Sequence, residues 1–137
     1  MARQYLLDTN ICVFYMRGMF DMNKKISTAG IDNCYLSDIT VAELYFGAEY
    51  SDHPSKTMKL TETFISQFKI LPFSGALHIF GREMAYLKSQ GRKIENFDMA
   101  IGSIALKNNM IMVTDNLDHF SRIRGLEIED WKISYPK

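Results

Sequence analysis

Short apolar runs alternate along the chain with longer stretches in which apolar side chains recur every three or four positions. The short runs suit buried β-strands, and the longer stretches have the spacing of amphipathic helices. Strands are expected at residues 4–7, 34–36, 69–71, 110–114 and 127–132, and helices from residue 9 onward and at residues 20–27, 40–50, 55–68, 77–89 and 97–108. This alternation predicts an α/β protein with three layers, α/β/α, around a mainly parallel sheet of roughly four to five strands.

The length favours one domain over residues 1–137. Of the 137 residues, 47% are apolar, which suffices for one core. Neither a secretory leader nor an apolar run near the ~20 residues of a membrane span is visible, so a cytoplasmic protein is expected. Cys12 and Cys34 lie among apolar neighbours, which favours free core thiols over a disulfide or a zinc site.

Four acids stand where carboxylates of distant segments can meet. Asp8 and Asp115 each follow an apolar strand, whereas Glu43 and Asp98 fall within the first turn or so of predicted helices. In an open α/β sheet, ligands bind at the carboxyl ends of the strands. Singly, each acid is an ordinary turn or helix-start residue. Together they indicate a site for a hard divalent cation such as Mg²⁺ or Mn²⁺, which prefers oxygen ligands.

The order of these motifs resembles PIN-domain proteins of the VapC toxin type, over nearly the whole chain. The likeness is carried by Leu6–Asn10, Ser37–Leu44, Asn96–Asp98 with Ile101 and Ala105, Val113–Asn116, His119–Phe120 and Gly125–Trp131. The resemblance implies a metal-dependent RNA endonuclease that acts as the toxin of a toxin–antitoxin pair, with tRNA among its candidate substrates. It also implies a VapB-like antitoxin partner and a homodimer.

The resemblance also implies roles for individual residues. Asp8, Glu43 and Asp98 match the three central acids of the family, with Glu43 orienting the attacking water and accepting its proton. The fourth position stays open, because Asn116 stands in the usual place of an acid, with Asp115 beside it and Asp118 two residues on. The expected catalytic set is Asp8, Glu43, Asp98 and Asp115, and the expected metal ligands are Asp8, Asp98, Asp115 and Asn116. Hydrolysis of this kind leaves a 5′ phosphate and a 3′ hydroxyl.

Contacts to RNA must come from local features. Sixteen basic and sixteen acidic residues leave no net charge, which excludes attraction of nucleic acid by bulk charge. Arg92 and Lys93 directly precede the helix of Asp98 and are the basic pair expected to bind substrate. Thr9 and Asn10 are expected to hold Asp8 by hydrogen bonds and to contact substrate. His119 follows the fourth acidic cluster, where local hydrogen bonding is the simpler interpretation and a phosphate contact the alternative.

Aromatic residues crowd the early helices. They are Phe14, Tyr15, Phe20, Tyr45, Phe46 and Tyr50. Burial is the default for aromatic side chains, so more of them are expected in the core than in a groove for the antitoxin.

Two other functions fit part of the pattern. A PIN-type module without activity would bind RNA or protein only, and Asn116 mildly favours it while the three intact acids oppose it. An aspartate-nucleophile phosphotransferase would need a second Asp two residues after Asp8, where this chain has Asn10.

Overall fold

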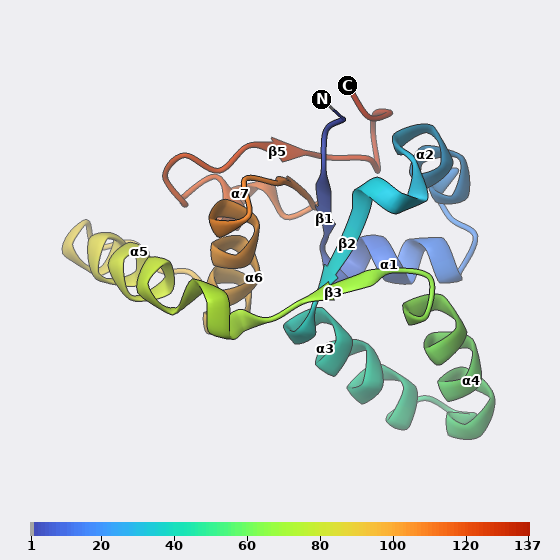
Figure 1. Cartoon of the computed structure of the whole chain (residues 1–137). Helices are drawn as coiled ribbons and strands as arrows, with labels where there is room; N and C mark the ends of the chain where they lie inside the picture. Colours follow the sequence, from blue (N-terminus) through green and yellow to red (C-terminus); the bar gives the residue numbers. More distant parts are fainter. Residues whose placement is uncertain (1) are drawn as a thin grey trace.

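A five-stranded parallel sheet forms the centre of the protein (Figure 1). The structure is a computed structural model that describes residues 2–137. The strands are β1 (Tyr5–Leu7), β2 (Cys34–Ser37), β3 (Lys69–Leu71), β4 (Ile111–Val113) and β5 (Ile128–Glu129). They lie in the order β3-β2-β1-β4-β5, and all four pairings between neighbours are parallel. The α/β/α fold with a parallel sheet, expected from the alternation of strands and helices, is confirmed.

Helices cover both faces of this sheet. They are α1 (Thr9–Met16), α2 (Met22–Ala29), α3 (Asp38–Glu49), α4 (Pro54–Ile65), α5 (Leu77–Ser89), α6 (Asn96–Lys107) and α7 (Leu117–Phe120), with short 3₁₀ segments at Ile31–Asn33 and Phe73–Ala76. The bounds of β3 and α5 match the sequence prediction, and most other ends differ by a few residues. Helix α7 and the 3₁₀ segments were not predicted, because a single turn is too short to display a hydrophobic period.

Helix starts depend on which side chain caps them. Ser37 caps α3, since its Oγ accepts a hydrogen bond from the Thr40 backbone nitrogen at 2.9 Å. Asn96, a residue type that commonly caps helices, is instead the first helical residue of α6, and Glu95 occupies the N-cap position in extended conformation. Asp98 therefore lies in the first turn of α6, as expected.

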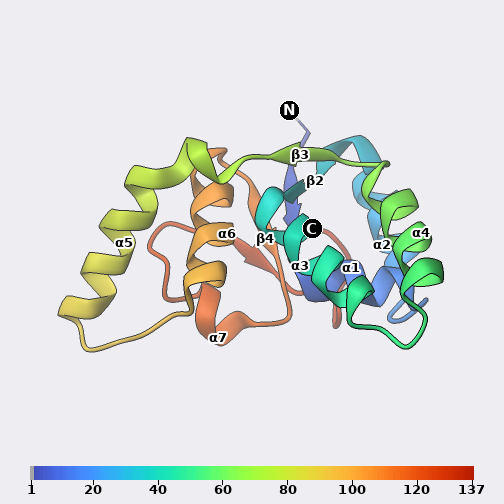
Figure 2. The ribbon, with the colours of Figure 1, turned by 90° about the horizontal axis from the view of Figure 1, so that it is seen from below.

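Alternation along the strands divides the core in two. Tyr5 and Leu7 belong to one apolar cluster, and Leu6, which points to the other face of the sheet, belongs to the second. The first cluster packs against α1, α2, α3 and α4, and the second against α5, α6 and α7. Figure 2 shows these two groups of helices on opposite sides of the strands.

The carboxyl ends of β1 and β4 form the natural place for a ligand. From the central strand β1, the sheet continues through β2 and β3 on one side and through β4 and β5 on the other. Such a switch point leaves a crevice between the loops that follow the two strands. The backbone nitrogen of Asp8 donates to the Val113 carbonyl at 2.8 Å, which holds the two loops together.

The expectation that more of the six early aromatic side chains lie in the core than on the surface was wrong. Phe20, Tyr45, Phe46 and Tyr50 are exposed, and Phe14 and Tyr15 are only partly buried. Phe46 and Tyr50, which are 68% and 82% exposed, stack on each other with ring centroids 5.7 Å apart. They lie one helical turn apart, so they extend each other's apolar surface on α3. Cys12 and Cys34 are buried free thiols, as expected. Among residues 2–137, no helix has the length and apolar character needed to cross a membrane.

Candidate active site

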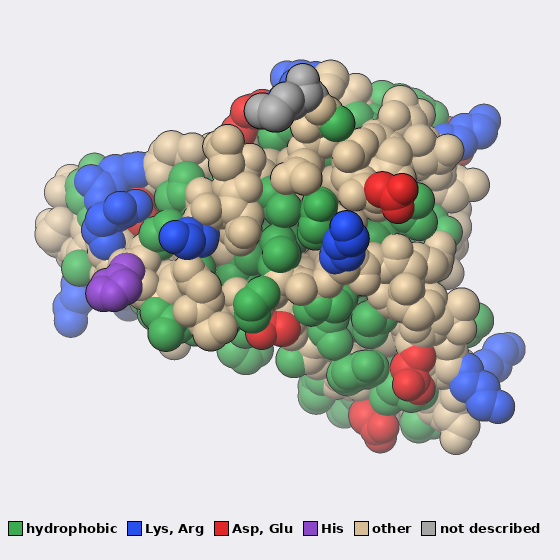
Figure 3. Space-filling view, viewed as in Figure 1, with side chains coloured by type: hydrophobic (Ala, Val, Ile, Leu, Met, Phe, Trp, Pro, Cys, Tyr) green, Lys and Arg blue, Asp and Glu red, His purple; other side chains and the backbone are tan. Residues whose placement is uncertain are grey.

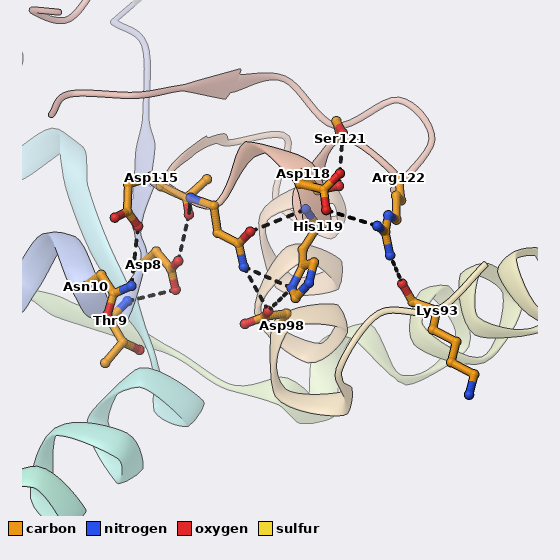
Figure 4. Close-up of polar contacts among 12 residues, drawn as sticks. Asp8, Thr9, Asn10, Lys93, Asp98, Asp115, Asp118, His119, Ser121 and Arg122 are labelled. Carbon is orange, nitrogen blue, oxygen red and sulfur yellow. Dashed lines mark hydrogen bonds and ion pairs between the residues drawn. The ribbon is translucent and has the colours of Figure 1, made fainter. Parts of the chain in front are cut away.

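Asp8 is held rigidly at the end of β1. It is the N-cap of α1, and its Oδ1 accepts a hydrogen bond from the Thr9 backbone nitrogen at 2.8 Å. Its Oδ2 accepts from the Thr114 hydroxyl, which follows β4, at 2.7 Å. The residue is 6% exposed. Both carboxylate oxygens are therefore fixed by groups from the two loops that flank the switch point (Figure 4).

The surroundings of Asp8 disfavour its negative charge. Burial raises the pKa of the Asp8 carboxyl to about 6, against the opposing effect of the hydrogen bonds from Thr114 and Thr9, and the nearby carboxylates of Asp98 and Glu43 raise it further. Neither Asp8 nor Glu43 forms an ion pair with any of residues 2–137. This carboxylate therefore lacks a compensating cation from the part of the chain that is described.

Thr9 connects two of the acids. Its backbone nitrogen binds Asp8, and its hydroxyl lies 2.6 Å from Glu43 Oε1 and 3.1 Å from Thr40 Oγ1. Because a hydroxyl has one hydrogen and two lone pairs, the Thr9 hydroxyl donates to Glu43 and accepts from Thr40. The expectation that Thr9 holds Asp8 thus applies to its backbone, whereas its side chain orients Glu43. Helix α3 brings Glu43 to this position.

A second polar cluster surrounds Asp98. His119 Nδ1 lies 2.9 Å from Asp98 Oδ2, and the amide nitrogen of Asn116 lies 3.4 Å from the same oxygen. The Asn116 carbonyl oxygen points instead to the start of α7, where it accepts from the His119 backbone nitrogen at 3.4 Å. Local hydrogen bonding, the simpler of the two expectations for His119, is confirmed. The contact with Asp98 was not predicted, and the signal in the sequence is the spacing of three residues between Asn116 and His119 in a turn that follows a strand.

The other two candidates for the fourth acid of the site, Asp115 and Asp118, bind partners other than Asp98. Asp115 Oδ1 accepts a hydrogen bond from the Asn10 amide at 3.3 Å, so Asn10 holds Asp115 rather than Asp8. In Figure 4, Asp8 lies between Asp115 and Asp98. Asp118 is bound to Arg122 at 3.0 Å with a side chain that is 79% exposed. The fold therefore gathers Asp8, Glu43 and Asp98 and puts Asp115 at the edge of this group.

Arg92 and Lys93 lie on the loop that leads into α6. Both residues are exposed, and their side chains form no ion pair within residues 2–137. The Lys93 carbonyl accepts a hydrogen bond from Arg122, which follows α7. Through Lys93, this loop is thus bound to the segment that follows α7 (Figure 4).

These residues fit a hard divalent cation that keeps much of its water. Within residues 2–137, no three Asp, Glu, His or Cys side chains are already grouped as a complete set of ligands. Mg²⁺ does not require such a set, because it is commonly bound through one or two carboxylates with water and substrate oxygens. The Asp8 carboxylate is buried, has two like charges nearby and has no Lys or Arg paired to it. A cation bound beside it would therefore stabilise its negative charge.

Comparison with known proteins supports the same interpretation. The model of the PIN domain matches residues 5–126. Ribonuclease VapC2 of Haemophilus influenzae is 36% identical over 131 residues, which cover 93% of this chain and 98% of that protein. The tRNA(fMet)-specific endonuclease VapC of Shigella flexneri is 33% identical over 93% of this chain and 98% of its own. The crystal structure of DNA-bound VapBC from Salmonella typhimurium contains a chain that superposes with a TM-score of 0.88 at 31% identity, over 94% of this chain and 98% of the other.

Proposed function

The chain belongs to the PIN domain family and to its VapC ribonucleases, and from that premise we propose that it is a metal-dependent endoribonuclease acting as the toxin of a toxin–antitoxin pair. The observation that carries this proposal is the meeting of Asp8, Glu43 and Asp98 at the switch point of the sheet, with Asp8 buried and without a paired Lys or Arg. The relative named for tRNA(fMet) makes tRNA the first substrate to test.

Each residue of the site has a distinct part in the proposed hydrolysis of an RNA phosphodiester. A divalent cation, Mg²⁺ or Mn²⁺, would lower the pKa of water and offset charge that develops on the phosphate. Asp8 and Asp98 would hold this cation, with Asp115 and Asn116 beside them. Glu43, oriented by the Thr9 hydroxyl, accepts the proton of the attacking water. Arg92 and Lys93 bind substrate phosphates, and the products carry a 5′ phosphate and a 3′ hydroxyl.

The test is metal-dependent cleavage by the purified protein. Cleavage of total tRNA is expected with Mg²⁺ or Mn²⁺, and no cleavage is expected in excess chelator. Cleavage with Ca²⁺ should be weak, because its larger and looser coordination shell positions water poorly. Asp98→Asn provides the control for a contaminating ribonuclease, because it removes a charge from the site while leaving the exposed surface nearly unchanged. Undiminished cleavage in chelator, or by Asp98→Asn, would rule out the mechanism. A folded protein that binds RNA but never cleaves it would favour the inactive module.

A groove beside the site suits the antitoxin. A hollow of about 340 Å³ lies between α1, α3 and α4, and its lining includes Thr9 and Glu43 of the site as well as Leu60, which is 59% exposed. An apolar segment of a VapB-like antitoxin that fills this hollow would lie against the catalytic carboxylates. Several solved structures similar to this chain are toxin–antitoxin complexes of the VapBC type. We therefore place the inhibitory partner in this groove.

We also propose that the 137 residues act as one domain, in the cytoplasm, and as a homodimer. The exposed Phe46 and Tyr50 pair provides apolar surface for association, and twofold dimers are the commonest oligomers. Light scattering of the isolated toxin should give twice the 15.8 kDa mass of the chain. A monomer at high micromolar concentration would contradict the dimer.

A further inference from the structure

A hollow at the C-terminal end of α5 has the composition of a nucleotide subsite. Its volume is about 480 Å³, within the range of small-molecule pockets. The floor is apolar, from Met84, Leu87 and Ile94, and the rim carries three cations. The cations are Lys88, Arg92 and Lys93. An apolar floor with a cationic rim matches the two parts of a nucleotide, a base and its phosphates.

This hollow continues toward the proposed active site. A second hollow of about 330 Å³ shares Lys93 and Ile94 with the first and is lined further by Glu95, His119 and Arg122. His119 in turn contacts Asp98. The two hollows thus lie in sequence between the surroundings of Asp98 and the end of α5.

The backbone that carries these cations is held at both ends. Gly91 adopts a positive φ of 67°, and the backbone nitrogens of Gly91 and Arg92 donate to the carbonyls of Lys88 and Leu87 at 3.1 and 2.9 Å. This pattern is a Schellman motif, which closes the end of α5. Arg122 binds the Lys93 carbonyl at the other end of the loop. The loop therefore presents its side chains from a defined position relative to His119.

Helix α5 itself is anchored to the segment after α7. Glu83 is 1% exposed and accepts hydrogen bonds from the Arg124 backbone at 3.1 Å and from its guanidinium at 2.8 and 3.2 Å. Arg124 also stacks on Tyr86, 3.7 Å from the ring centre. Burial would raise the pKa of the Glu83 carboxyl, but the bonds from Arg124 hold it below its usual value. This ion pair fixes α5, which forms one wall of the hollow, to the segment that follows α7.

The cations are not needed to complete the helix. Basic residues near a helix C-terminus commonly compensate its unpaired carbonyls and its dipole. Here the carbonyls of Tyr86, Leu87 and Lys88 already accept backbone hydrogen bonds. The side chains of Lys88, Arg92 and Lys93 form no ion pair within the described residues 2–137. Figure 3 shows Lys and Arg side chains gathered over the end of the molecule that α5 occupies.

We propose that this hollow binds one unpaired base of the RNA substrate, with the adjoining phosphates on Lys88, Arg92 and Lys93. This inference rests on the proposed ribonuclease function and adds a base-binding subsite to it. A base that is paired within a continuous duplex cannot enter an apolar hollow, whereas a base in a loop or single strand can. RNA bound in this way is therefore unpaired at the nucleotide whose base enters the hollow.

The test fills the hollow without touching a buried or charged residue. Ala85 lines the hollow and is exposed, so Ala85→Trp occupies the space of the base. The probe is a fluorescent oligouridylate of about twelve nucleotides, within the range of single-strand site sizes, compared with an RNA duplex of equal length in Ca²⁺ buffer. Ala85→Trp is expected to weaken binding of the single strand about tenfold, because one base loses its place in the hollow, and to leave the duplex unaffected.

Matched variants separate this effect from general disturbance. His78→Trp introduces the same side chain at an exposed position of α5 outside the hollow and should bind as the wild type does. Lys88→Ala should weaken binding and reduce the slope of log affinity against log salt by about 0.7, whereas Lys59→Ala on α4 should not. If Ala85→Trp lowers the melting temperature, Ala85→Leu, a smaller filler and good helix former, replaces it.

The outcomes distinguish the subsite from the nuclease. If Ala85→Trp binds the single strand as tightly as the wild type does and still cleaves RNA with Mg²⁺, the hollow is not a base-binding subsite. The proposed ribonuclease function would then be unaffected. A wild-type protein that neither binds nor cleaves RNA overturns both. Weakened binding of the single strand with unchanged binding of the duplex establishes the subsite.

Discussion

At the scale of single residues, Asp8 carries the main electrostatic conflict of the protein. A buried carboxylate with two acidic neighbours costs stability, and the chain retains it although Thr9 and Thr114 could be satisfied by an amide. Such a cost is expected where a charge serves binding or catalysis rather than folding.

Replacing Asp8 by Asn should therefore separate stability from activity. The folded-state pKa of about 6 exceeds the ordinary 3.8, so the folded protein binds a proton that the unfolded chain releases, and stability falls as pH rises from about 4 to about 6. Without metal, Asp8→Asn should gain up to about 3 kcal/mol over the wild type at pH 7 and almost nothing near pH 4. Cleavage should fall by several orders of magnitude. Denaturant unfolding of both proteins at pH 4 and pH 7 measures this difference in stability. A variant that fails to fold would show that Asp8 is required for the structure rather than for catalysis.

The fourth position gives a second prediction at this scale. Asn116 presents its amide nitrogen to Asp98, so Asn116→Asp replaces a donor by a like charge while keeping the cap of α7. It should bind Mn²⁺ more tightly, and its melting temperature without metal should be lower.

Asp115→Asn is the matched change, because Asn can still accept the bond from Asn10. If Asp115 supplies charge to the site, Mn²⁺ affinity should fall about tenfold, in line with roughly 1 kcal/mol or more for a unit charge a few ångström away. An unchanged titration would remove Asp115 from the site.

At the scale of elements, the distance between α6 and α7 sets the contact of Asp98 with His119. Residues 99–105 of α6 are all buried, and α6 is a central element of the second core. A Cβ at Gly102 would lie 2.3 Å from Ile123 Cδ1 and 3.3 Å from Phe120 Cδ1. The absence of a side chain at Gly102 therefore permits the close approach of these elements.

Gly102→Ala should destabilise the protein despite the better helix propensity of Ala. Propensity favours Ala by about 1 kcal/mol, but overpacking against the buried Ile123 costs about 1–3 kcal/mol or more. A net loss near 1–2 kcal/mol and reduced cleavage are expected, and Ile123→Val, which lacks Cδ1, should restore part of both. Gly81→Ala on α5 is the control, because its Cβ would meet nothing within 4 Å. Equal melting temperatures of Gly102→Ala and the wild type would refute the packing argument.

At the scale of the whole molecule, the groove between α1, α3 and α4 would connect regulation with the proposed site, because Leu60 and Glu43 both line it. A partner bound to the apolar part of this groove would also cover the carboxylate of Glu43.

Leu60→Glu should accordingly weaken binding of the antitoxin more than tenfold, because a charge would replace an apolar contact inside a desolvated interface. Affinity is measured by calorimetry with the cognate VapB-like antitoxin. Ile133→Glu, the same kind of change at a side chain that is 77% exposed outside the groove, is the control. Equal affinity of Leu60→Glu and the wild type would place the antitoxin elsewhere.

The sequence by itself determined the layered fold and the end of the sheet that carries the acids. Apolar periodicity is a local property, so β3 and α5 were predicted with their observed bounds. Parallel strands share one carboxyl edge, so the positions of Asp8 and Asp115 directly after apolar strands were enough to assign both residues to that edge.

Only the tertiary structure decided which polar groups meet. The contacts of Thr9 with Glu43 and of His119 with Asp98 join residues 34 and 21 positions apart, and they depend on how helices pack rather than on any local pattern. The exposure of Phe46 and Tyr50 had the same origin, because an apolar stripe on a helix does not specify what covers it. Local forces set the elements, whereas the geometry of the candidate site arises from packing between them.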